Sequence, residues 1–220
     1  MIKVLVADDQ TLIRAGLAAL IRAAPGLQVV AEADDGEQAV RLAATTRPHV
    51  ILMDIRMPTM DGITATQHIL AAAEPPPPQV LILTTFDIDA YVYQALRAGA
   101  CGFLLKETQP ERLLAAIHTV AAGDSLLSPG LIQRLIETFH PEPGTSPPVP
   151  GLAPLTSRET EVLTLVGRAL SNAAIATRLQ VSEATVKTHL NRAMTKLGLS
   201  SRAQTVAFAY ESGLVSPRRP

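Results

Sequence analysis

The sequence predicts an α/β fold, a five-stranded parallel sheet doubly wound by helices, followed by a separate all-α domain of four helices. Three observations lead to this prediction. In residues 1–125, short apolar runs alternate five times with helix-like segments. Residues 140–154 are dense in proline, which ends regular structure. Beyond them lie four short stretches of helical pattern, each with its own start signal.

Each short, mainly apolar run of the first half is a candidate strand. In residues 50–53 the run is four consecutive apolar residues, which suits a strand buried on both faces. The expected strands are residues 3–7, 27–31, 50–54, 80–84 and 102–105. Right-handed crossovers between parallel strands favour the flavodoxin-like strand order 2-1-3-4-5.

The helices between the strands are expected at residues 10–23, 35–45, 62–73 and 87–98. Gly99 closes the fourth of them. A fifth helix is expected to start at a capping box formed by Thr108 and Glu111. The first helix carries its apolar residues at Leu12, Ile13, Leu17, Leu20 and Ile21.

Polar side chains stand where these strands end. The first strand ends in Asp8 and Asp9, the third in Asp54, the fourth in Thr84 and the fifth in Lys106. Because ligands of open parallel sheets bind beyond the carboxyl ends of the strands, we expect these groups to converge on one rim. Clustered carboxylates repel one another unless a cation is present, and all-oxygen ligands suit Mg²⁺.

A strand-end carboxylate can also act as a nucleophile and form an aspartyl phosphate. A neighbouring ammonium and hydroxyl would stabilise charge on the phosphoryl oxygens. Taken singly, each of these residues has a plainer explanation, since Asp commonly caps helices and Thr commonly lies in turns. Their coincidence at four strand ends favours the chemical interpretation.

Charge is distributed unevenly along the chain. Residues 1–150 carry 10 Lys/Arg and 16 Asp/Glu, a net of −6, whereas residues 151–220 carry 9 and 4, a net of +5. The basic half is therefore the candidate for a polyanion partner. The single cysteine, Cys101, excludes a disulfide within the chain. Asp8 interrupts the first apolar run too early for a signal peptide, and no run of 18 apolar residues occurs, so we expect a cytoplasmic protein without membrane contact.

Residues 126–154 are expected to connect the two halves. Residues 126–139 include a short apolar helix, and the six prolines that follow leave only an extended, semi-rigid linker: Pro141, Pro143, Pro147, Pro148, Pro150 and Pro154. The domains are accordingly expected at residues 1–125 and 155–220.

The second half contains a helix-turn-helix candidate, two short helices joined by a turn of three or four residues. Its four helices are expected to start at a capping box formed by Thr156 and Glu159, at Ser171, at Ser182, and at Ser200 or Ser201. The last helix offers Val206, Phe208 and Ala209 either to the core or to a self-complementary dimer contact.

Residues 183–197 form the informative helix of this half. An apolar stripe contains Val186, Leu190, Ala193, Met194 and Leu197. The remaining surface is basic and hydrogen-bonding, as a helix that enters the major groove of duplex DNA requires, and carries Thr185, Lys187, Thr188, Asn191 and Arg192. A solvated structural face is the plainer alternative.

The first half resembles the receiver domain of bacterial two-component response regulators. The residues that carry the resemblance are Asp8-Asp9, Asp54, Met57-Pro58-x-Met60-Asp61-Gly62, Thr84, Ala98-Gly99-Ala100 and Lys106. The resemblance implies that Asp54 is the phospho-acceptor and that Asp9, Asp54 and the Arg56 carbonyl bind Mg²⁺, with Asp8 acting through water. It also implies that Thr84 and Lys106 hold the phosphoryl oxygens, and that Phe103 is the switching aromatic.

The second half is similar to LuxR-type helix-turn-helix domains. The similarity rests on Leu155-Thr156-x-Arg158-Glu159-x-Glu161-Val162-Leu163, Ser171-Asn172-x-x-Ile175-Ala176, Val181-Ser182-x-x-Thr185-Val186-Lys187-x-His189-Leu190 and Lys196-Leu197. Ala174 departs from the pattern, which usually has Glu there. Together the two resemblances indicate a NarL/FixJ-class response regulator.

The resemblances imply a transcription factor, not an enzyme, that takes phosphate from a sensor histidine kinase and binds duplex DNA as a homodimer. Two alternatives stay open at this point. A constitutive DNA-binding regulator would have a receiver that takes no phosphate. A phosphatase of the haloacid dehalogenase type would use Asp54 as its nucleophile, but it usually has a second acid where this chain has Arg56.

Overall fold

The computed structural model describes residues 1–84, 89–123, 126, 154–168 and 170–215. It divides into two compact units, Met1–Leu126 and Leu127–Pro220. The expected linker, with its short helix at residues 126–139, lies outside the described residues except at its two ends. None of the helices in the described ranges is long and apolar enough to cross a membrane.

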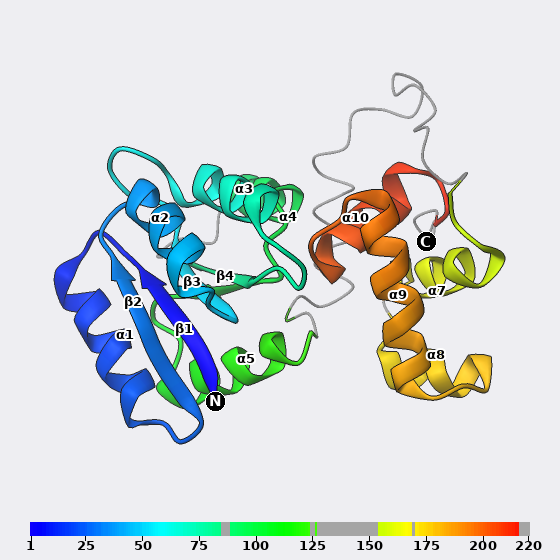
Figure 1. Ribbon diagram of the computed structural model, residues 1–220, viewed down its shortest axis with the longest axis horizontal. Helices are drawn as coiled ribbons and strands as arrows, with labels where there is room; N and C mark the ends of the chain where they lie inside the picture. The colour runs from blue at the N-terminus through cyan, green and yellow to red at the C-terminus, as the bar shows by residue number, and fades with distance from the viewer. Residues whose placement is uncertain (85–88, 124–125, 127–153, 169, 216–220) are drawn as a thin grey trace. The chain divides into compact units, whose positions relative to one another are not determined.

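The first unit is built on a five-stranded parallel sheet (Figure 1). Its strands are β1 (Ile2–Ala7), β2 (Leu27–Ala33), β3 (Val50–Asp54), β4 (Gln79–Thr84) and β5 (Gly102–Leu105). Their order is β2-β1-β3-β4-β5, and each neighbouring pair is parallel. The predicted strand order is therefore confirmed.

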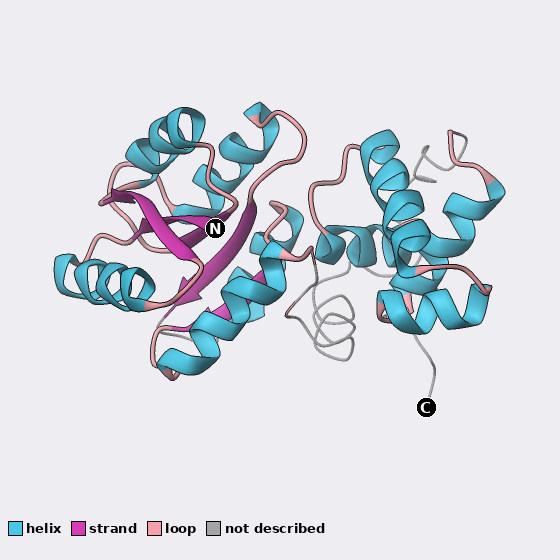
Figure 2. Ribbon diagram, turned by 60° about the horizontal axis from the view of Figure 1, so that its bottom comes forward, coloured by secondary structure: helices cyan, strands magenta, loops and turns pink. Residues whose placement is uncertain are grey.

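Helices cover both faces of this sheet (Figure 2). They are α1 (Thr11–Ala23), α2 (Gly36–Thr46), α3 (Gly62–Ala72), α4 (Asp89–Arg97) and α5 (Pro110–Ala121). In β3, Ile51 and Met53 pack with α2, α3 and α4, whereas Val50 and Leu52 pack with α1 and α5. Alternate residues thus enter different cores, which explains why the strand is apolar up to its last residue, Asp54.

In this unit one of the apolar residues noted for the first helix lies outside the core, and one expected helix cap does not form. Leu12 is 87% exposed. It lies six positions before the buried Ala18, and at 100° per residue this places it roughly 120° from the buried side of α1. The capping box at Thr108 is also absent, because the N-cap of α5 is Gln109 and makes no side-chain cap. Pro110 restricts the residue before it to non-helical conformations, so the helix begins later than the box requires.

The second unit contains α7 (Ser157–Gly167), α8 (Asn172–Leu179), α9 (Glu183–Leu197) and α10 (Arg202–Glu211). The Thr156–Glu159 capping box is formed as predicted. Side-chain hydroxyls also cap the other three helices, and the cap of α10 is Ser201. The turn between α8 and α9 passes through Gln180 in the left-handed region, at a φ of 54°.

The core of the second unit lies where α7 meets α9 and α10. A Cβ atom added to Gly167 would lie 2.6 Å from Ala209 Cβ, so α7 and α10 approach closely there. Val206 and Ala209 are 4% and 0% exposed. These two residues therefore belong to the core of the unit and are not available for a dimer contact, whereas Phe208 is half-buried.

Candidate functional site

Three carboxylates converge at the carboxyl ends of β1 and β3, as the sequence predicts. One oxygen each of Asp8, Asp9 and Asp54 lies within 4.8 Å of the other two. Asp8 and Asp54 are buried, and Asp9 is exposed. The cluster is therefore reached from solvent on the Asp9 side.

Lys106 joins the two buried carboxylates. Its Nζ donates a hydrogen bond to Asp54 Oδ2 at 2.8 Å and lies 2.7 Å from Asp8 Oδ2. The side chains of the three residues are between 0% and 7% exposed. The contact with Asp8 is ionic and lacks hydrogen-bond geometry, so Asp8 Oδ2 is the one buried side-chain oxygen of the described structure that receives no hydrogen bond.

Burial and charge act in opposite directions on these groups. Burial raises the pKa of Asp54, and the charge of Asp8 adds to this, while the hydrogen bond and charge of Lys106 lower it; the net shift is upward. Burial lowers the pKa of Lys106, but the close contacts with the Asp54 and Asp8 carboxylates and their negative charges outweigh burial and raise it. The ammonium therefore stays charged while holding two crowded carboxylates.

The backbone around the cluster is held by contacts that sequence reasoning missed. The Gln10 amide donates to Asp8 Oδ1 at 2.9 Å, and Arg14 Nη1 donates to the Asp8 carbonyl at 2.6 Å. The Gly62 amide donates to the Ile55 carbonyl at 2.9 Å. A Cβ at position 62 would lie 1.9 Å from the Asp54 carbonyl oxygen, so only glycine permits this approach of α3 to β3.

Thr84 lies at the same end of the strands, and the other predicted switch residue, Phe103, lies further back on β5. Thr84 is buried at the end of β4, and its carbonyl accepts a hydrogen bond from the Lys106 amide at 2.8 Å. Thr84 and Lys106 are thus held together by the ladder between β4 and β5. Phe103, on β5, is half-buried and packs on the core beneath α2, α3 and α4.

In the second unit, the buried side of α9 agrees with the predicted stripe. Val186, Leu190 and Ala193 are buried, while Met194 and Leu197 are half-buried. The expected DNA-facing set is exposed at Lys187, Thr188, Asn191 and Arg192, and Thr185 is half-buried.

Two hydroxyls of this set are engaged within the helix. Thr185 Oγ1 lies 2.8 Å from Ser182 Oγ, and Thr188 Oγ1 donates to the Ala184 carbonyl at 2.9 Å. The other three residues, Lys187, Asn191 and Arg192, place two cations and one amide at exposed positions of the same helix.

Comparison with known proteins identifies the families of the two halves of the chain. Residues 4–118 match the family model of the response regulator receiver domain, and residues 153–209 match that of bacterial regulatory proteins of the luxR family. The chain belongs to the response regulators.

Relatives of this regulator align along almost its whole length. The uncharacterized transcriptional regulatory protein YxjL of Bacillus subtilis is 43% identical over 97% of each chain. The nitrate/nitrite response regulator protein NarL of Escherichia coli is 34% identical over 94% of each chain. The crystal structure of the response regulator ChrA, from a heme-sensing two-component system, is 36% identical, covers 97% of this chain and 98% of its own, and has a TM-score of 0.51. The regulator is therefore a two-component transcriptional regulator of the NarL type.

The regulator also has an ion pair in its output domain that the sequence did not reveal. Lys196 Nζ donates to Glu159 Oε2 at 2.7 Å, and the same oxygen accepts the Thr156 amide at 2.8 Å. The hydrogen bond from Lys196 is the main reason why the pKa of Glu159 falls to about 2. This pair joins the start of α7 to the last turn of α9.

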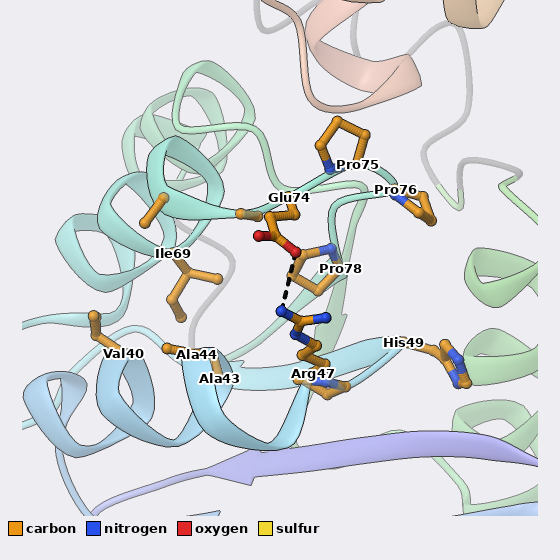
Figure 3. A pocket seen from close by; sticks show the side chains of 13 residues that line it. Val40, Ala43, Ala44, Arg47, His49, Ile69, Glu74, Pro75, Pro76 and Pro78 are labelled. Carbon is orange, nitrogen blue, oxygen red and sulfur yellow. Dashed lines mark ion pairs between the residues drawn. The ribbon is translucent and has the colours of Figure 1, made fainter.

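A cavity of about 420 Å³ lies at the amino ends of the regulator's strands, between the ends of α2 and α3 (Figure 3). Its walls are mainly Ala, Ile and Pro side chains, and Arg47 and Glu74 form an ion pair of 3.0 Å beside it. Pro48 and His49, which precede β3, also line it. The cavity is therefore separate from the carboxylate cluster, which lies at the other end of β3.

Proposed function

We propose that Asp54 accepts a phosphoryl group and that this modification controls DNA binding by the second domain. The observation that carries the proposal is the position of Lys106 Nζ, 2.8 Å from Asp54 and 2.7 Å from Asp8, next to the exposed Asp9. A buried carboxylate beside a fixed ammonium and a solvent-accessible acidic neighbour has the nucleophile and the charge stabilisation that phosphoryl transfer requires.

The donor set fits a magnesium ion. Three carboxylate oxygens lie within 4.8 Å of one another, and Asp8 Oδ2 receives no hydrogen bond. Hard, all-oxygen donors of this kind suit Mg²⁺. Asp9, Asp54 and the Arg56 carbonyl would hold the ion, with Asp8 acting through water. When bound, the ion neutralises charge on the phosphoryl oxygens and on the crowded carboxylates.

The residues of the chain itself perform the transfer. An oxygen of Asp54 attacks phosphorus, a bond from Asp54 to phosphorus forms, and the bond to the leaving group breaks. Lys106, already directed at Asp54, donates to one phosphoryl oxygen, and the Thr84 hydroxyl donates to another. Phe103 lies further back on β5, opposite Ile82, and would follow a movement of Thr84 by changing its burial.

The two alternatives have less support. A receiver that takes no phosphate would have no need for two buried carboxylates beside a lysine, since such a cluster carries a desolvation cost. A phosphatase would need a second acid near the nucleophile, and the residue two positions after Asp54 is the exposed Arg56.

The remaining parts of the proposal concern partners and domain limits. A sensor histidine kinase supplies the phosphoryl group, and residues 155–220 bind duplex DNA through Lys187, Asn191 and Arg192, with Thr185 and Thr188 beside them. Two-fold DNA sites favour a homodimer as the active form. The receiver comprises residues 1–125, and residues 126–154 connect it to the output domain.

The test is phosphorylation of the full-length protein with Mg²⁺ and phosphoramidate, followed by intact mass. The native protein should gain one base-labile phosphoryl group, and Asp54→Ala should gain none. Asp9→Ala should lose the magnesium dependence and most of the rate. Asp34→Ala, which removes an exposed carboxylate at the end of β2, is the matched control and should label normally. Undiminished labelling of Asp54→Ala would overturn the proposal.

A further inference from the structure

The cavity between the ends of α2 and α3 has the size and the walls of a small-molecule site. Its volume of about 420 Å³ lies in the range of ligand pockets, which are mostly apolar and contain a few polar groups. α2 contributes Val40, Ala43 and Ala44 to its walls, and α3 contributes Ile69 and Ala72. Because alanine side chains are short, the two helices leave space between their ends.

One ion pair lies at this cavity, and it is weakly held. Arg47 Nη2 lies 3.0 Å from Glu74 Oε2, and both side chains are 77% exposed. Figure 3 shows Arg47 directed toward Glu74, beside the apolar side chains of the two helices. Since an exposed ion pair adds little to stability, a competing ion can separate it at a cost of less than about fivefold in affinity.

The backbone at this end of the two helices favours a cation. Arg47 is the C-cap of α2 and Ala73 is that of α3, and both residues line the cavity. The last carbonyls of a helix lack partners within it and carry partial negative charge. Beyond α3, residues 75–78 are prolines, which have no amide hydrogen to donate to these carbonyls. A ligand with positive charge and N–H donors would therefore find acceptors at this site.

The ionisable side chains of the cavity add to this preference. Among the described residues that line it, Glu74 is the one acid. His49 Nδ1 accepts a hydrogen bond from the Lys3 amide at 2.9 Å, so the imidazole is neutral in this arrangement. Arg47 is then the group that competes with a cationic ligand. Its displacement leaves one carboxylate and two helix ends of negative potential around the cavity.

We propose that this cavity binds a small organic amine, a primary ammonium group on an apolar body the size of an aromatic ring or a short branched chain. The ammonium replaces the Arg47 guanidinium beside Glu74 and donates to carbonyls at the end of α3. The apolar body packs between Ala44 and Ile69. The site lies at the amino ends of the strands, away from the carboxylate cluster, and goes beyond the proposed phosphoryl transfer.

An anion is the opposite candidate, because Arg47 could pair with it. Such a ligand would have to take Arg47 from Glu74 and leave that carboxylate unpaired beside itself, next to two helix ends of the same sign. An amine instead releases Arg47, whose long side chain is already 77% exposed and can extend into water. The charges of the cavity therefore favour the amine.

The experiment titrates the full-length protein with three probes of one skeleton, 2-phenylethylamine, 2-phenylethanol and 3-phenylpropanoate. Binding is followed in ¹H–¹⁵N correlation spectra through the amides of Ala43, Ala44, Ile69 and Ala72. The amine should bind with a dissociation constant of about 1 mM, as expected for a ligand of so few atoms. The alcohol should bind about two- to fivefold more weakly, because it lacks the charge, and the carboxylate more weakly still.

Two substitutions should shift the affinity for the amine in opposite directions. Glu74→Gln should weaken it about two- to fivefold and Arg47→Gln should strengthen it by a similar factor, since each removes one charge of the exposed pair. Ala44→Leu, at an exposed position of α2 that lines the cavity, should abolish the spectral shifts. The controls are Glu37→Gln and Arg41→Gln, which change a second exposed ion pair of α2 outside the cavity and should leave the affinity unchanged.

Three results would overturn the proposal. Tighter binding of the carboxylate than of the amine would show an anion site, and equal binding of all three probes would show apolar binding without selection for charge. Spectral shifts that are absent from these amides, or that persist in Ala44→Leu, would exclude the cavity as the site. None of these measurements depends on phosphorylation of Asp54, so the proposed function is tested separately.

Discussion

Lys196, in the last turn of α9, lies 2.7 Å from Glu159, in the first turn of α7. Glu159 is 3% exposed and also completes the capping box of its own helix. One carboxylate thus starts α7 and anchors the end of the helix that carries the expected DNA contacts. The orientation of α9 should therefore depend on the negative charge of Glu159.

The first prediction concerns this carboxylate and pH. Its folded-state pKa of about 2 lies below the ordinary value of 4.5, so its contribution to stability is complete above about pH 4.5 and is lost as the pH falls toward 2. Glu159→Gln should lower the melting temperature of fragment 151–220 at pH 6. It should also reduce the fall in melting temperature between pH 4.5 and 2. Glu161→Gln, at an exposed position of the same helix, should show the same fall in melting temperature as the native fragment. Equal profiles for the two variants would contradict the assignment.

The second prediction is that neutralising Asp54 stabilises the receiver. Its raised pKa means that burial penalises the charged form, so the penalty is present at neutral pH and disappears as the pH falls from the folded-state pKa to the unfolded value near 3.8. Asp54→Asn should therefore raise the melting temperature at pH 7 by on the order of a few degrees. The difference from the native protein should shrink at lower pH. Asp34→Asn, at an exposed site, should raise the melting temperature at pH 7 only slightly. An equal rise in the two variants would count against burial as the cause.

The third prediction tests the close approach of α3 to β3. Gly62→Ala would place a methyl group 1.9 Å from the Asp54 carbonyl oxygen. Neither atom can move away without a shift of the backbone. We expect a loss of about 1–3 kcal/mol in the free energy of unfolding, measured with urea, and slower phosphorylation because Asp54 is displaced. Gly16→Ala is the control, since no atom lies within 4 Å of its new Cβ and alanine favours a helix by about 0.5–1 kcal/mol. A Gly62→Ala protein as stable as Gly16→Ala would refute this account.

The fourth prediction concerns DNA. Fragment 151–220 should bind duplex DNA with a steep salt dependence, because its net charge of +5 acts through phosphate contacts and counterion release. Lys187→Ala and Asn191→Ala should each weaken binding to a specific site by about 1–3 kcal/mol if they contact base edges. Arg168→Ala, which removes an exposed cation at the end of α7, should weaken specific and random DNA alike. Binding that is insensitive to salt, or to both α9 substitutions, would exclude this docking face.

Local sequence signals correctly predicted the features that depend only on residues close in sequence. Residues 50–53 of β3 are all apolar because they pack alternately against the two layers of helices, so this run predicts a central parallel strand. The caps at Ser171 and Ser182 need only the following three residues, and both form. Strand order and the convergence of Asp8, Asp9, Asp54 and Lys106 then follow from the handedness of parallel crossovers.

Contacts between segments that are distant in sequence could not be predicted from local signals. Thr108 and Glu111 have the spacing of a capping box, but the proline between them shifts the start of α5. Lys196 is 37 positions from Glu159, and Arg56, whose guanidinium lies over the Tyr91 ring, is 35 positions from it, so no periodicity or motif links either pair. Such pairs depend on how helices pack against one another, and side-chain geometry at that range is fixed by the whole core and not by neighbours in sequence.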